Sequence, residues 1–221
     1  MFDAHRHQSL DTPQSRNALY ASASQGQWKA LQSLQKPAIA GIGSLFNEPL
    51  PPIEELEKML KKHPDYQIAE VGMDRRFGNL EKQQQFLDEV LQIAYQYSRS
   101  VSLHCVQASS QLLELLRKKK SSLPPLLWHG FTESYETALE ASRLNIILSY
   151  GPRLYKSKLA REEKRLITFP FALETDYEHT QEAGYQTLLE QHIQNFCALC
   201  SIHEEQLIRN NDEIRTILTN Q

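Results

Sequence analysis

Short apolar segments alternate with longer amphipathic segments along almost the whole of this 221-residue chain. The short segments are rich in β-branched and other apolar residues, as buried β-strands are. We predict eight strands, at residues 2–5, 18–23, 38–43, 68–73, 101–105, 126–130, 146–150 and 171–175. Strands that alternate with helical segments are typical of βαβ units, so the sequence predicts a parallel sheet.

The segments between the predicted strands carry the period of amphipathic helices. In residues 80–98, Leu87, Val90 and Leu91 follow the i, i+3, i+4 spacing of a core-facing stripe. Residues 53–63 have glutamates early and lysines late, which suits the helix dipole. The remaining helices are expected at residues 109–119, 133–144, 185–200 and 203–218.

Eight strand–helix repeats predict an α/β fold of one domain, a single (β/α)8 barrel of the TIM type over residues 1–221. The segment after the first strand, SLDTPQSRN at residues 9–17, lacks a helical period. We therefore expect the first helix of the barrel to be shortened or missing.

Composition narrows the class of protein. The formal net charge is -3, so any contact with nucleic acid would need a local patch of positive charge. No apolar run approaches the roughly 20 residues that span a bilayer. The chain starts with a polar, histidine-bearing strand instead of a signal peptide, and its three cysteines are an odd, sparse set. We expect a protein of the reducing cytoplasm.

Two of the cysteines, Cys197 and Cys200, form a Cys-x-x-Cys pair inside a predicted helix. A redox pair and half of a zinc site are both conceivable. Two small apolar residues on a buried helix face are the interpretation we favour.

Six side chains that bind metals in other proteins lie at or near the ends of predicted strands. They are His5, His7, Glu70, His104, His129 and Asp176. In a parallel barrel these strand ends converge on one rim, where functional sites of this fold lie. Six groups exceed the needs of one tetrahedral ion. Two divalent ions bridged by a carboxylate fit better, and Glu70 is the natural bridge because its two oxygens can be shared.

Each histidine also has a simpler interpretation. A lone histidine on a strand, such as His104 or His129, is more often a core or surface residue than a ligand. His5 and His7 are stronger candidates, because residues two apart on a strand face the same side. His63, His192 and His203 lack a position at a strand end. A further histidine, at position 179, could line the site, but a solvated loop is the interpretation we favour.

The order of these motifs resembles that of TatD-type metal-dependent hydrolases of the amidohydrolase superfamily, over nearly the whole chain. The matches are residues 3–7 (Asp-x-His-x-His), 70–74 (Glu-x-Gly-Leu-Asp, with Met at 73), 83 and 86 (Gln and Phe), 104 and 108 (His and Ala), 129–131 (His-x-Phe) and 174–176 (Glu-Thr-Asp). Any one of these motifs is weak, but six in order are a specific signal.

This resemblance implies two adjacent divalent ions. One would be held by His5, His7, Glu70 and Asp176, and the other by Glu70, His104 and His129. It also implies hydrolysis, since known members act as deoxyribonucleases, often on 3′ ends. DNA, single-stranded or at its 3′ ends, is therefore the expected partner, and no membrane or obligate protein partner is expected.

Two departures concern the substrate side of the site. The family commonly carries Gly-x-His-Pro after its third strand, where this chain has Gly41-Ile42-Gly43-Ser44. A Pro-Tyr pair often follows Glu-Thr-Asp, where this chain has Tyr177-Glu178. The ligand set is complete while loops facing the substrate differ, so hydrolysis is expected and the substrate is open.

The expected mechanism uses a water activated between two ions, identified only as Mg, Mn or Zn. Asp176 would accept its proton as general base, and Glu70 would bridge the ions. Arg75, Arg76 and Arg153 follow predicted strand ends and are candidates for contacts with phosphate. Arg75 and Arg76 could equally form surface ion pairs. Asp74 is expected to orient a ligand or a loop.

Other functions remain open at this point. The same site could hydrolyse an amide, lactone or phosphotriester in a small molecule, because fold and metals do not fix the substrate. A metal-binding scaffold without catalysis is a third possibility, which the complete ligand set argues against. Trp128 and Tyr150 could stack on a base, although the barrel core is the favoured place for Trp128.

Overall fold

Eight parallel strands form a nearly closed barrel in the computed structural model, which describes residues 1–7, 16–46, 49–178 and 182–219. The strands are β1 (Asp3–His7), β2 (Ala18–Ala21), β3 (Ile39–Ile42), β4 (Gln67–Asp74), β5 (Val101–Val106), β6 (Leu126–Trp128), β7 (Ile147–Tyr150) and β8 (Phe171–Leu173). Each pairs with the next in sequence order. The prediction of a TIM-type α/β barrel is confirmed.

Backbone hydrogen bonds draw the first strand and the end of the last strand together. The amide of Asp176 donates to the carbonyl of His5 (3.0 Å), and the amide of His7 donates to the carbonyl of Tyr177 (3.0 Å). Two residues of the candidate site, far apart in sequence, are thus fixed against each other by the closure of the barrel.

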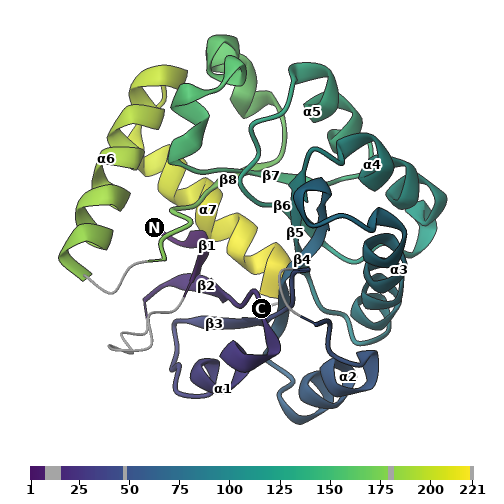
Figure 1. Ribbon diagram of the computed structural model, residues 1–221. Helices are drawn as coiled ribbons and strands as arrows, with labels where there is room; N and C mark the ends of the chain where they lie inside the picture. The colour runs from purple at the N-terminus through teal and green to yellow at the C-terminus, as the bar shows by residue number, and fades with distance from the viewer. Residues whose placement is uncertain (8–15, 47–48, 179–181, 220–221) are drawn as a thin grey trace.

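Helices surround the barrel, as Figure 1 shows. They are α1 (Trp28–Leu31), α2 (Ile53–Lys62), α3 (Leu80–Gln96), α4 (Ser109–Lys118), α5 (Tyr135–Ser142), α6 (Glu182–Cys200) and α7 (Glu204–Thr219). The six helices predicted from periodicity are all present. Between β7 and β8 the chain forms two 3-10 segments instead, η4 (Pro152–Lys156) and η5 (Lys158–Thr168). The expected first helix falls mainly at residues 8–15, outside the described residues, and residues 16–17 are not helical.

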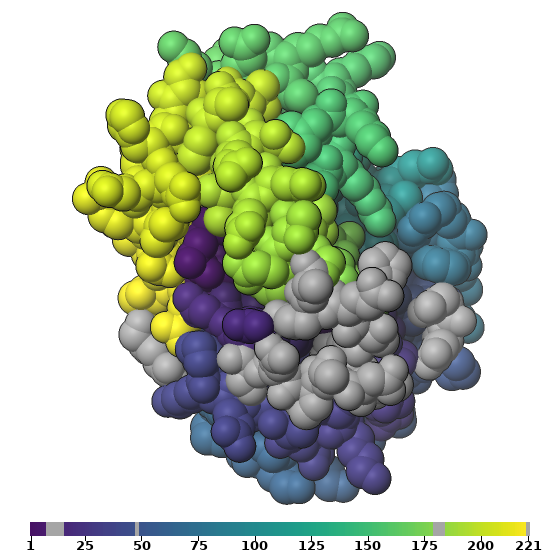
Figure 2. All heavy atoms as spheres, turned by 90° about the vertical axis from the view of Figure 1, so that its left-hand side faces the viewer, coloured from purple at the N-terminus to yellow at the C-terminus, as the bar shows by residue number. Residues whose placement is uncertain are grey.

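Helix α7 covers the end of the barrel at which the strands begin. Ile214 and Leu218 pack into a buried cluster with inward-facing apolar residues of the strands, such as Phe2 and Leu127. Figure 1 shows α7 lying across this end, and Figure 2 shows the first residues (purple) packed against α6 and α7 (lime to yellow). With this end filled by apolar side chains, polar chemistry is confined to the opposite end, where the strands finish. We call that end the C-terminal rim.

Asn211 attaches α7 to the barrel. Its side chain is fully buried, donates to the carbonyls of Phe2 (2.8 Å) and Leu173 (3.1 Å), and accepts from the amide of Leu173 (3.2 Å). Three hydrogen bonds to backbone groups of β8 and the start of β1 thus depend on one amide.

We expect Asn211→Ala to lower the free energy of unfolding by about 2–4 kcal/mol, because buried backbone groups lose their partners. Urea denaturation followed by circular dichroism measures this change. Asn195→Ala, at an exposed position of α6, is the matched control and should stay within about 0.5 kcal/mol of the wild type. A variant as stable as the control would contradict the anchoring role of Asn211.

Irregularities in β1 and β4 turn the ligand-bearing residues inward. The register between β4 and β5 shifts between Ala69 and Val71. Ala69 belongs to the interior cluster, and Glu70 directly after it also faces the barrel axis. A regular strand would place neighbours on opposite faces, so the irregularity is needed to aim Glu70 at the site. The β1–β2 register shifts in the same way between Asp3 and Arg6.

No described helix has the length and apolar character needed to cross a membrane. On α6, Cys200 is buried and Cys197 is half-buried, and both are free thiols. Neither belongs to a group of three potential metal ligands within the described part of the chain. Their placement fits the interpretation as helix-face residues.

Candidate metal centre

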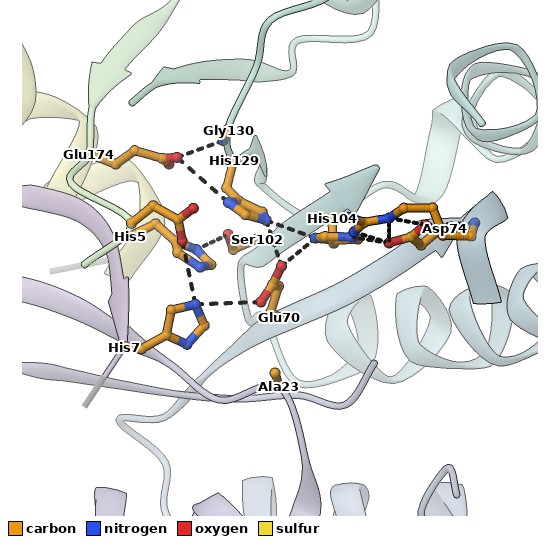
Figure 3. A network of polar contacts seen from close by, with 12 residues as sticks. His5, His7, Ala23, Glu70, Asp74, Ser102, His104, His129, Gly130 and Glu174 are labelled. Atoms are coloured by element: carbon orange, nitrogen blue, oxygen red, sulfur yellow. Dashed lines mark hydrogen bonds and ion pairs between the residues drawn. The ribbon is translucent and has the colours of Figure 1, made fainter. Parts of the chain in front are cut away.

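All six predicted ligands meet at the C-terminal rim. They come from β1 (His5 and His7), β4 (Glu70), β5 (His104), the residue after β6 (His129) and the loop after β8 (Asp176). Figure 3 shows His5, His7, Glu70, His104 and His129 converging from their separate strands. The simpler interpretation of the histidines, as isolated residues of the core or of the open surface, therefore does not fit their positions.

One group of potential ligands consists of Glu70, His104 and His129. His129 Nε2 lies 2.7 Å from Glu70 Oε1 and 3.1 Å from His104 Nδ1, and His104 Nδ1 also contacts Glu70 Oε1. Ligand atoms around a tetrahedral zinc ion lie about 3.3 Å apart, given bonds of about 2.0 Å. A small outward shift of these side chains would place them around one ion.

A second group consists of His5, His7 and Glu70. His7 Nε2 lies 3.7 Å from Glu70 Oε2 and 3.5 Å from Asp176 Oδ1. His5 Nδ1 is paired with Ser102 Oγ at 2.8 Å, while its Nε2 is buried without a hydrogen-bond partner. A buried polar atom without a partner is costly, and a bound cation would satisfy it. The donor set therefore fits a divalent metal.

Glu70 belongs to both groups and offers a different oxygen to each. Its Oε1 faces His104 and His129, and its Oε2 faces His7. This arrangement is compatible with the predicted bridging role.

Asp176 reaches the site from an unusual backbone conformation. Its φ is +50°, in the left-handed region, which aspartate tolerates better than most residues. The hydrogen bond from its amide to the carbonyl of His5 holds this conformation. Its carboxylate also forms a potential ligand group with His5 and His129, so it lies within reach of both halves of the centre.

The carboxylates of Glu70 and Asp176 remain ionised despite their burial. Burial raises the pKa of Glu70, but the positive charge of His129 and hydrogen bonds with His104 and His129 outweigh it and hold the pKa well below its usual value. Burial also raises the pKa of Asp176, but the hydrogen bond with His7 and nearby imidazoles lower it to about 2. Burial lowers the pKa of His5 and keeps its ring neutral, the form that binds metals.

Asp74 supports the site from outside the ligand groups. Its Oδ2 lies 3.2 Å from His104 Nε2, the ring nitrogen that faces away from Glu70. Asp74 also binds the guanidinium of Arg76 at 2.5–3.0 Å. An acceptor on the far nitrogen of a ligand histidine fixes its tautomer and orientation. This geometry agrees with the expectation that Asp74 orients a ligand.

We expect Asp74→Asn to weaken binding of a divalent metal by about tenfold, because the acceptor behind His104 loses its charge. Calorimetric titration of the metal-free protein with Zn²⁺ or Mn²⁺ measures this affinity. Asp65→Asn, at an exposed position, is the matched control and should bind as the wild type does. Equal affinity in both variants would show that Asp74 does not orient His104.

Three further supporting residues were given no role from the sequence. Asp3 accepts from the amide (2.9 Å) and hydroxyl (2.6 Å) of Thr175, and burial raises its pKa to about 6. Glu174 Oε1 accepts from the amide of Gly130 at 2.6 Å and lies 3.6 Å from His129 Nδ1. Asp3 and Glu174 belong to the family motifs at residues 3–7 and 174–176, and this membership could have indicated a role for them. Ser102 carried no signal.

The three predicted phosphate contacts have different surroundings. Arg153 is exposed, and its Nη2 lies 3.7 Å from Asp176 Oδ2. Arg75 is exposed and donates from Nε to the carbonyl of Gln107 (2.8 Å). Arg76 is engaged by Asp74 in an ion pair. The first two are the better placed for an anion.

Other predicted residues lie away from the centre. Trp128 and Tyr150 are buried and have no exposed face for a base. His63 stacks on Tyr66, and His192 pairs with Tyr150 and Tyr155. Within the described residues, neither these histidines nor His203 enters a ligand group. Position 179 lies outside the described residues.

The missing histidine of the third strand has a structural reason. Its place is taken by Gly43, where an added Cβ would lie 2.1 Å from the amide nitrogen of Glu70. Backbone packs directly against backbone here, so no side chain fits without movement of β3 or β4.

An eight-stranded barrel with clustered histidines and carboxylates at its C-terminal rim is typical of metal-dependent hydrolases. A family model described as "TatD related DNase" matches residues 3–216 of the chain. The chain belongs to this family.

Curated relatives share part of their length with the chain. An uncharacterized metal-dependent hydrolase of Escherichia coli K12, YjjV, is 29% identical over 76% of this chain and 67% of its own length. A similar hydrolase of Haemophilus influenzae is 25% identical over 62% of this chain and 57% of its own length. The 3′-5′ ssDNA/RNA exonuclease TatD of Edwardsiella piscicida is 32% identical over only 35% of this chain and 31% of its own length.

Solved structures share the fold. The crystal structure of E. coli YjjV, a TatD homologue, superposes with a TM-score of 0.81 at 20% identity and covers 100% of this chain and 98% of that one. A TatD family hydrolase from Entamoeba histolytica gives a TM-score of 0.74 at 14% identity, over 91% of this chain and 84% of that one.

Proposed function

We propose that this protein hydrolyses phosphodiester bonds of DNA at single-stranded or 3′ ends, with two divalent ions at its C-terminal rim. The observation that carries the proposal is the sharing of Glu70 between two groups of potential ligands. His5, His7, Glu70 and Asp176 would hold one ion, and Glu70, His104 and His129 the other. Mg²⁺, Mn²⁺ and Zn²⁺ all suit this mixture of imidazole and carboxylate.

When bound, the ions would acidify a coordinated water and polarise the phosphoryl group. The protein supplies the remaining steps. Asp176 is ionised, is held near His7 (3.5 Å) and accepts the proton of the attacking water. Glu70 directs one carboxylate oxygen to each of the two ligand groups, which fixes the distance between the two groups. Arg153, next to Asp176, is placed to contact a phosphate of the substrate.

Support for a nucleic-acid substrate comes from two sources. The relative from E. piscicida is described as an exonuclease of single-stranded DNA and RNA. Exposed arginines also flank the site, Arg75 after β4 and Arg153 after β7. These provide local positive charge on a chain whose net charge is negative.

Cleavage of 3′- and 5′-end-labelled single-stranded DNA tests the proposal. We expect cleavage with Mg²⁺ or Mn²⁺, its loss with chelator and its return when the metal is added back. No cleavage by folded, metal-loaded protein would overturn the nuclease function. Turnover of an amide, lactone or phosphotriester by the same preparation would then support the small-molecule hydrolase instead.

A further inference from the structure

One aromatic side chain at the C-terminal rim is exposed. Of the large hydrophobic residues in the described part of the chain, Phe77, Tyr95, Leu139 and Ile217 are exposed. Phe77 alone among these four lies in a segment that directly follows a strand, the 3-10 segment η2 (Arg75–Phe77) after β4. The same strand carries Glu70 and Asp74. An apolar ring at the rim of the site, with 43% of its surface exposed, contributes little to the core.

Phe77 is joined to the candidate metal centre by a short series of contacts. The guanidinium carbon of Arg76 lies 5.7 Å from the centroid of its ring. Arg76 is clamped to Asp74, and Asp74 contacts His104. The segment that carries the Phe77 ring is therefore held in place by contacts with residues of the candidate metal centre.

The segment that carries Phe77 is exposed, and the position after it borders open space. Gly78 follows with φ +67°, and an added Cβ there would meet no atom within 4 Å. Arg75, two residues before Phe77, donates a hydrogen bond from Nε to the carbonyl of Gln107 and is otherwise exposed. A partly exposed aromatic ring near an arginine is a combination that binds an unpaired base and its phosphate.

We propose that Phe77 is a stacking platform for an unpaired nucleobase of the substrate and that Arg75 contacts the adjacent backbone phosphate. This inference rests on the proposed function and deepens it, since it assigns the single-stranded character of the substrate to a particular surface. A base inside a duplex keeps its faces stacked on its neighbours, so a platform of this kind favours single strands and frayed ends.

Binding of an oligonucleotide carrying 2-aminopurine tests the inference without turnover. The measurements use the Asp176→Asn background with Mn²⁺, and stacking on an aromatic ring quenches the fluorophore. We expect Phe77→Leu to weaken binding about tenfold and to remove the quenching, and Phe77→Trp to retain both. Tyr95→Leu, at an exposed position of α3, is the matched control and should bind as the parent does.

An abasic oligonucleotide separates stacking from other effects. It should bind the parent and Phe77→Leu equally, because it has no base to stack. In the active enzyme, Phe77→Leu should raise KM for single-stranded DNA about tenfold, whereas Tyr95→Leu should leave this KM at the wild-type value.

Failure of this inference differs from failure of the proposed function. If the wild type cleaves DNA and Phe77→Leu binds and cleaves like Tyr95→Leu, the platform is wrong and the nuclease stands. If DNA binds with dependence on Phe77 but is never cleaved, the platform stands and the nuclease is wrong. If the parent does not bind the oligonucleotide, the platform is overturned.

Discussion

Replacing Asp176 by asparagine is expected to lower kcat for phosphodiester hydrolysis by about a thousandfold, within the range that a positioned general base contributes. The carboxylate of Asp176 is ionised throughout the neutral range and lies among the potential metal ligands, where we propose that it accepts a proton from the attacking water. An amide of the same size has no basic oxygen. The backbone of Asp176 needs no change, because asparagine also tolerates a positive φ.

Steady-state kinetics with end-labelled single-stranded DNA measures this loss. Asp212→Asn removes a carboxylate at an exposed position of α7 and, purified in parallel, reveals any contaminating nuclease. Thermal denaturation of both variants shows whether folding is preserved. Retention of more than a tenth of wild-type kcat by a folded Asp176→Asn would contradict its role as the base.

The second large effect is expected at Glu70. Glu70→Gln should reduce the content of divalent metal from about two ions per chain to less than one, with activity falling below detection. Glutamine has one oxygen acceptor and no charge, so it cannot serve both ligand groups. The variant also removes the negative charge of the carboxylate that lies 2.7 Å from His129, so the attraction of the site for a divalent cation is weaker.

Metal content is measured by inductively coupled plasma mass spectrometry after incubation with metal and gel filtration. Glu213→Gln, at an exposed position of α7, is the matched control. Glu70→Asp, which keeps the charge on a shorter side chain, should retain more metal than Glu70→Gln. A wild type that holds a single ion, together with a Glu70→Gln that still holds it, would contradict the bridge.

The sequence predicted the number and order of the strands, because buried strands are apolar runs and hydrophobic patterning is local. The predicted positions of the strand ends were less accurate. His129 was placed inside a strand and lies one residue after β6, whereas β1 extends two residues further than predicted and includes His7. A strand ends where backbone pairing stops, and pairing depends on neighbours that are remote in sequence.

The ligands could be predicted because their residue types are unusual at strand ends, whereas of their supporting residues only Asp74 was predicted. Asp3 and Thr175 are 172 residues apart, and no local pattern announces their hydrogen bonds. The inward turn of Glu70 depends on an irregular register that alternation does not reveal. For Arg76, phosphate contact and a surface ion pair were equally expected, because the sequence does not show that Asp74 binds it.

The closure of the barrel also sets the order in which the site is completed during synthesis. Glu70, His104 and His129 leave the ribosome well before Asp176, so one ligand group is available while the chain is still growing. The carboxylate of Asp3 gains its hydrogen bond from the hydroxyl of Thr175 only after Thr175 has been synthesised. The carbonyl of His5 likewise gains its hydrogen bond from the amide of Asp176 only near the end of synthesis. A nascent chain can therefore acquire metal ligands without acquiring the proposed base. The candidate ligand set is therefore complete only when β1 and the segment after β8 meet.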